Sequence, residues 1–153
     1  MNGNKVGKGK VGVWTVVLIV VIGVVAIILV GGFVFMWPGL REVKDLVIND
    51  VDFQNLHDGT YVGEYIGIKD HLRDTKIEVV VSGGEISSIK VLKGAIDKEG
   101  VPRKLTGGLG VDDLLNVVAV KKTLQVDVIT GATLTSKTHL KALENALKQA
   151  QVD

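Results

Sequence analysis

The chain has 153 residues, 46% hydrophobic and 23% charged, which is room for one compact domain and excludes a multi-domain enzyme or a repeat array. The formal net charge is +1, and the segment after residue 40 carries 15 basic against 17 acidic residues, so it lacks the basic surface that nucleic-acid binding requires. Because the sequence has no cysteine, disulfides, thiol catalysis and cysteine-bound zinc or iron–sulfur clusters are excluded.

An uncharged apolar run near the N-terminus predicts a transmembrane helix over residues 14–37. Trp14 and Trp37 bracket it, as expected of side chains at the two membrane interfaces. The 22 residues between them would span roughly 33 Å as a helix, which matches the hydrocarbon core of a bilayer. We expect Pro38 and Gly39 to end this helix.

The flanking charges predict the orientation of the segment. Lysines at positions 5, 8 and 10 lie in a basic tail over residues 1–13, and basic flanks favour the cytoplasmic side. The C-terminal domain is then extracytoplasmic, at the surface of the cell membrane. The alternative is a cleaved signal peptide, but its apolar region usually has only about 7–15 residues and ends in an A-x-A-like site.

After the apolar run, the pattern predicts a linker over residues 38–57, with a short juxtamembrane helix over 40–57, and a domain over residues 58–153. Alternating apolar residues predict strands over 61–68, 76–81 and 86–92, and the last two form a hairpin around Gly83 and Gly84.

The second half of the domain is expected to be helical around one more strand. Apolar residues at 111, 114, 115 and 118 predict a helix that begins at Val111, and alternation over 124–128 predicts a short strand. Leu140, Leu143 and Leu147 lie on one face of a helix that begins at about Thr135. The predicted fold class is therefore α+β, with a small, largely antiparallel sheet packed with helices.

A hydroxyl-rich segment joins the last predicted strand to the last helix. Its residues are Asp127, Val128, Ile129, Thr130, Gly131, Ala132, Thr133, Leu134, Thr135 and Ser136. A tight Gly-Ala turn before a helix N-terminus exposes free backbone N–H groups, which favour an anion and especially a phosphate. The alternative interpretation is an ordinary helix cap, because Ser and Thr are common there.

This segment resembles the flavinylation motif D-x-x-[ST]-G-A-T of the FMN-binding domain family, which includes the C subunit of the sodium-pumping NADH:quinone reductase and the G subunit of Rnf-type complexes. The resemblance covers about residues 58–150, although the His-Glu-Thr-Pro-Gly-like segment of many relatives is absent. In that family a flavin transferase joins FMN, through its phosphate, to the last threonine of G-A-T. The resemblance therefore implies that Thr133 is the attachment residue, with further cofactor-binding positions at Asp127, Thr130, Gly131, Ala132, Leu134, Thr135 and Ser136.

The function that follows is a membrane-anchored flavoprotein that relays electrons. The partners implied are the membrane, a flavin transferase for maturation, and membrane redox proteins or quinone-linked electron donors. Two alternatives stay open: a reductase that binds FMN noncovalently, and an anchored sensor or scaffold that has lost the flavin. Whether the protein is itself an enzyme is left undecided by the sequence.

Other side chains have a functional and a structural interpretation. Tyr61 and Tyr65 share a strand face that could support a flavin ring, or they pack within the sheet. Lys137 and Lys104 could pair with the FMN phosphate, as could Arg103, or they are solvated surface charges. The three histidines lack metal-ligand spacing, and the sequence predicts no metal site.

Overall fold

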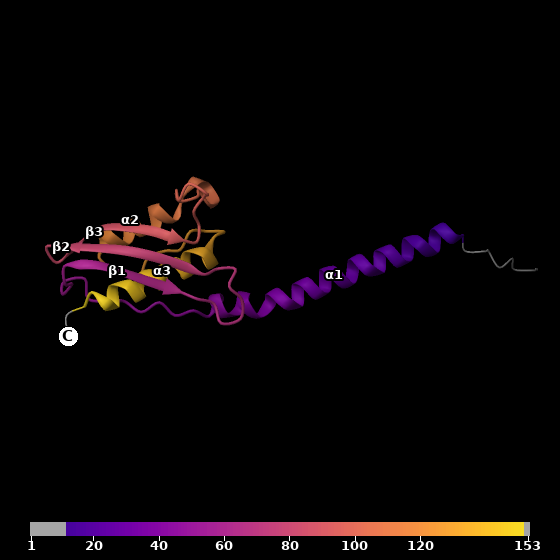
Figure 1. Cartoon of the computed structure of the whole chain (residues 1–153), viewed down its shortest axis with the longest axis horizontal. Helices are drawn as coiled ribbons and strands as arrows, with labels where there is room; N and C mark the ends of the chain where they lie inside the picture. Colours follow the sequence, from indigo (N-terminus) through magenta and orange to yellow (C-terminus); the bar gives the residue numbers. More distant parts are fainter. Residues whose placement is uncertain (1–11, 152–153) are drawn as a thin grey trace, which may run out of the picture. The chain divides into compact units, whose positions relative to one another are not determined.

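The computed structural model describes residues 12–151, so residues 1–11 of the predicted basic tail lie outside the described residues. Its elements confirm the α+β class: a long apolar helix is followed by a three-stranded antiparallel sheet and two helices (Figure 1). The chain divides into two compact units between Trp37 and Pro38. The predicted domain boundaries stay predictions.

Helix α1 spans Val13–Lys44 and is long and apolar enough to cross a membrane. Membrane anchors and N-terminal signal sequences share this character. The predicted end at Pro38 is wrong, because Pro38 lies inside α1. Proline removes one backbone hydrogen bond, but Val43, only 3% exposed, packs into the domain core and holds the last turn in place.

The sheet consists of β1 (Gly59–Tyr65), β2 (Thr75–Ser82) and β3 (Glu85–Lys93), hydrogen-bonded in that order. Its register pairs Gly63 with Ile77 and Val79 with Ile89, and all pairing is antiparallel. The three predicted strands and the hairpin are thus confirmed, although β1 stops at Tyr65 instead of residue 68.

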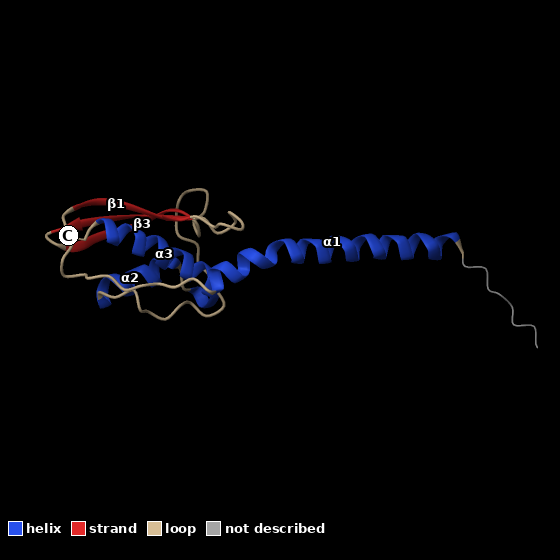
Figure 2. Ribbon diagram, turned by 90° about the horizontal axis from the view of Figure 1, so that it is seen from below, coloured by secondary structure: helices blue, strands red, loops and turns tan. Residues whose placement is uncertain are grey.

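Helices α2 (Val111–Lys121) and α3 (Thr133–Gln149) cover one face of the sheet, so that strands and helices form two layers (Figure 2). A 3₁₀ turn, η1 (Thr106–Gly108), precedes α2. The apolar faces predicted for α2 and α3 are buried against the sheet. Helix α3 contacts β1 and β2, while α2 contacts β3 and α3.

Two predicted elements are wrong. Residues 124–128 form no strand: the segment is irregular, and its Leu124 N–H donates to the Asp50 carboxylate at 2.8 Å. The Asp50 side chain thus supplies the hydrogen-bond acceptor that a neighbouring strand would supply. Leu124 is buried, as its apolar character predicts. The juxtamembrane segment is helical only to Lys44, and the described chain continues without helix to β1.

Candidate functional site

The hydroxyl-rich segment folds into a tight turn that leads directly into α3. The Ala132 N–H donates to the Ile129 carbonyl at 2.9 Å, which closes the turn. Gly131 has φ of 78°, a left-handed conformation that glycine adopts without strain. A Cβ at this position would also lie 3.0 Å from the Thr106 Oγ1 in η1. The left-handed backbone therefore favours glycine here, and the Thr106 side chain of η1 packs closely against this position.

Ser136 holds this turn from within. Its fully buried Oγ accepts a hydrogen bond from the Ile129 N–H at 3.1 Å and donates one to the Ala132 carbonyl at 3.0 Å. Both partners lie on the turn before the helix. Ser136 therefore shapes the turn, with its hydroxyl engaged in these two bonds.

Thr133 is the first residue of α3, two positions earlier than the predicted start, and its side chain is exposed. The first helical hydrogen bond is the one from the Ser136 N–H to the Ala132 carbonyl, at 2.9 Å. Among the described residues, the backbone N–H groups of Thr133, Leu134 and Thr135 have no acceptor, and the first turn contains no acidic side chain. Three free donors and the positive end of the helix dipole make this end of α3 suited to an anion.

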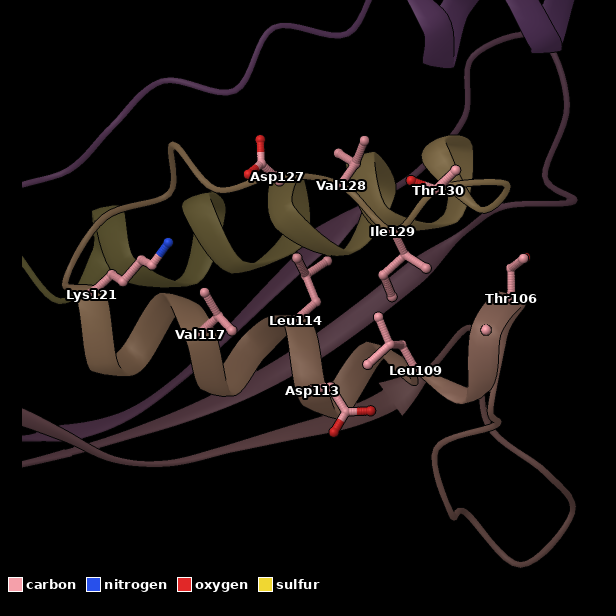
Figure 3. Close-up of a pocket in the computed structure, with 11 residues that line it drawn as sticks. Thr106, Leu109, Asp113, Leu114, Val117, Lys121, Asp127, Val128, Ile129 and Thr130 are labelled. Atoms are coloured by element: carbon pink, nitrogen blue, oxygen red, sulfur yellow. The ribbon is translucent and has the colours of Figure 1, made fainter.

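A cleft of about 450 Å³ lies beside the turn, with the segment 127–130 on one side and α2 on the other (Figure 3). Its lining is mainly apolar, and in Figure 3 the side chains of Leu109 and Ile129 point toward one another across it. Leu109 is 51% exposed and Val117, on α2, is 40% exposed. This volume lies in the range of about 300–1,000 Å³ that is usual for small-molecule sites.

Lys104 and Lys137, two of the cations predicted as phosphate partners, are engaged in structural contacts. The Lys104 Nζ lies 2.8 Å from the Asp113 Oδ2, which also accepts the Gly110 N–H at 2.6 Å. The hydrogen bond from the Gly110 N–H is the larger cause, and that from Lys104 the second, of a pKa of Asp113 below its ordinary value. The Lys137 Nζ donates to the carbonyls of Lys44 and Leu46. Neither lysine is arranged as a partner for a phosphate at the start of α3.

A buried histidine, His139, lies on α3 one turn after Thr135. The Nδ1–H of His139, which is 1% exposed, donates to the Thr135 carbonyl at 2.7 Å, and its Nε2 accepts the Ala95 N–H at 3.3 Å. These partners fix one neutral tautomer. Burial lowers the pKa of His139 and outweighs the hydrogen bond to Thr135, which acts in the opposite direction. His139 thus links Ala95, in the loop after β3, to Thr135 in the first turn of α3.

The face of β1 that carries Gly63 and Tyr65 is covered by α3 and offers no platform for a flavin. A Cβ on Gly63 would lie 2.1 Å from the Ala142 carbonyl oxygen, so the helix backbone rests directly on the strand. The Tyr65 hydroxyl donates to Glu42 at 3.0 Å; burial and this carboxylate raise its pKa to about 12. The packing interpretation of the two tyrosines is confirmed for Tyr65, which is 7% exposed.

The structure thus separates the predicted site residues into three groups. Asp127 and Thr130 line the cleft; Gly131 and Ala132 make the turn with Ser136; and Thr133, Leu134 and Thr135 present the free N–H groups. The α2 wall and Thr106 are additions that the sequence analysis missed; the glycine run at 107–108 was the one signal for that region. Among the described residues no cluster of side chains is suited to a metal ion.

Comparison with known proteins agrees with this geometry. A family model described as FMN-binding domain matches residues 71–148, about half of the chain, and so confirms the resemblance read from the sequence. No curated protein and no solved structure matches the chain. The residues present suit the FMN that the family implies: the α3 N-terminus offers donors for a phosphate, and the apolar cleft offers room for a flat ring system.

Proposed function

The chain belongs to the FMN-binding domain family, and on that premise we propose that it is a membrane-anchored, extracytoplasmic flavoprotein that carries FMN on Thr133 and relays electrons between membrane redox partners. One observation supports the attachment site above all: an exposed hydroxyl stands at the first position of α3, beside three unpaired N–H groups and an apolar cleft.

A flavin transferase supplies FMN in an activated form, in which the phosphorus is bonded through oxygen to a leaving group. The Thr133 oxygen bonds to the phosphorus, the bond from phosphorus to the leaving group breaks, and the leaving group is released with the proton of the Thr133 hydroxyl. The exposed side chain of Thr133 can enter another protein's active site. The free N–H groups of the first turn then bind the phosphate oxygens, and this turn has no acidic side chain to oppose the negative charge.

The chain itself binds and positions the cofactor. Bound FMN supplies reversible electron transfer, and the protein supplies placement and polarity. Leu109, Val117 and Ile129 give the ring apolar neighbours, while the exposure of the first two leaves one side of the cleft accessible to a redox partner. The cysteine-free chain has no redox group of its own, so a relay role depends on the flavin.

The experiment is expression of the full chain together with a flavin transferase, followed by denaturing gels and intact-mass measurement. We expect in-gel flavin fluorescence, and an added mass of one FMN less one water, for the wild type, Thr133→Ser and Thr60→Ala. Thr133→Ala should be dark. Thr60→Ala is the matched control, because it removes an exposed threonine on β1, outside the turn and the cleft.

The outcomes separate the alternatives. Flavin that leaves the wild-type chain on denaturation indicates a noncovalent flavoprotein, and a colourless chain indicates the sensor or scaffold. Fluorescence on Thr133→Ala would place the ester elsewhere. The same mass measurement reports whether residues 1–37 remain, which decides between anchor and signal sequence.

Orientation is tested separately with a single cysteine at Ser87, an exposed position on β3. The natural chain has no cysteine, so any labelling comes from this site. A membrane-impermeant maleimide should label intact cells if the domain is extracytoplasmic. Labelling only after cell lysis would refute that orientation.

A further inference from the structure

The loop that joins β1 to β2, residues 66–74, exposes three large aliphatic side chains. Ile68 is 84% exposed, Leu72 is 70% exposed and Ile66 is 56% exposed. Single exposed aliphatic residues are common on soluble proteins, but three in one short loop form a patch that indicates an interaction site.

This β1–β2 loop is held in a defined shape by carboxylates. Glu42, on the last turn of α1, accepts the Ile68 N–H at 2.8 Å and the Lys69 N–H at 2.9 Å. The Gly67 N–H donates to Asp74 at 3.1 Å, and the Leu72 N–H donates to Asp70 at 3.0 Å. The loop backbone is thus fixed while its aliphatic side chains point into solvent, so their exposure is built into the fold.

The loop is also tied to the residues where the chain would leave a membrane. The Asp70 carboxylate fills the space in which a Cβ on Gly39 would stand. Gly39 comes two residues after Trp37, the predicted interfacial tryptophan, so the covalent chain keeps these two Cα atoms within about 7 Å of each other. This limit on the distance between Trp37 and Gly39 holds for any orientation of the apolar segment.

We propose that the β1–β2 loop is a second membrane contact, in which Ile66, Ile68 and Leu72 enter the headgroup region of the leaflet from which α1 emerges. Lys69 is exposed in the same loop, and its ammonium group is attracted to anionic lipid headgroups. The contact limits rotation of the domain about its tether. This inference rests on the membrane anchor of the proposed function, but on neither FMN nor Thr133.

The test uses the full chain in vesicles of phosphatidylcholine and phosphatidylglycerol that contain lipids spin-labelled near the headgroup. A fluorophore is attached to a single cysteine at Ile68→Cys or, as the control, at Val120→Cys. Val120 lies on α2 and is 83% exposed, so the two probes start from the same exposure. We expect quenching at position 68 to be about twofold stronger or more, because interfacial apolar groups lie about 5–10 Å deep.

A second variant shows whether the aliphatic side chains, and not the tether alone, cause the contact. Adding Ile66→Ser and Leu72→Ser to Ile68→Cys should reduce quenching to the level at position 120. Both side chains are exposed, so the fold should tolerate the change.

Flotation of the vesicles separates this proposal from the anchor on which it rests. Equal quenching at 68 and 120 in protein that floats with the vesicles refutes the loop contact and leaves the anchor intact, as does quenching that the serine variants do not change. Protein that does not float refutes the anchor, and the loop contact with it.

Discussion

Replacing Ser136 by alanine tests whether the turn before α3 is held from inside. The substitution removes the hydroxyl that accepts the Ile129 N–H and donates to the Ala132 carbonyl. Since the serine is completely buried, water does not replace it, and the Ile129 N–H loses its acceptor. An unsatisfied buried donor costs about 1–3 kcal/mol, and the better helix propensity of alanine returns about 0.5 kcal/mol.

The expected net loss is therefore about 0.5–2.5 kcal/mol, or a fall in Tm of about 2–10 °C for a domain of this size. The assay is urea unfolding of the detergent-solubilised chain without flavin, together with amide hydrogen exchange at Ile129. Thr133→Ala is the matched control, because it removes an exposed hydroxyl from the same helix end and should leave the urea midpoint unchanged. An unchanged midpoint for Ser136→Ala, with Ile129 still protected, would refute this account of the turn.

Three further predictions concern the packing of α3 against the rest of the domain. Gly63→Ala places a methyl group 2.1 Å from the Ala142 carbonyl oxygen and should cost at least about 1–3 kcal/mol in urea unfolding; wild-type stability would contradict direct contact of α3 with β1. Burial raises the pKa of Glu144, but two lysines and Asn49 outweigh it, so the folded pKa is lowered. Stability gained from this carboxylate is present above the ordinary pKa of 4.5 and is lost in acid, so Glu144→Gln should cost about 1–3 kcal/mol at neutral pH and little at pH about 3. The pKa of His139 in the folded chain is below its ordinary 6.5, so the unfolded chain takes up the proton at higher pH than the folded chain does. Wild-type stability should therefore fall as the pH drops below about 6.5. His139→Gln should reduce this dependence of stability on pH between about 6.5 and 5.

Much of the fold followed from local patterns. The three strands and the buried faces of α2 and α3 were predictable because side-chain periodicity of two or near 3.6 directly reflects which face is covered. Two wrong predictions, at residues 124–128 and at Pro38, also came from local patterns. Residues 124–128 alternate like a strand, yet no strand lies beside them; Asp50, far away in the sequence, supplies the hydrogen-bond partner. Pro38 predicts a helix end, yet packing of Val43 in the core keeps the helix going.

Local patterns were enough to predict the apolar segment, the three strands and the Gly-Ala turn before the last helix, since each depends on neighbouring residues and their backbone preferences. Which side chains meet depended on the three-dimensional fold: α2 and η1 wall the cleft, and Glu42 fixes the β1–β2 loop. These contacts join residues distant in the chain and form only when the sheet and helices pack, which no local pattern encodes. The Ser136 contacts are short in sequence, but they too were not predicted, because they require that Ser136 be buried beneath the turn.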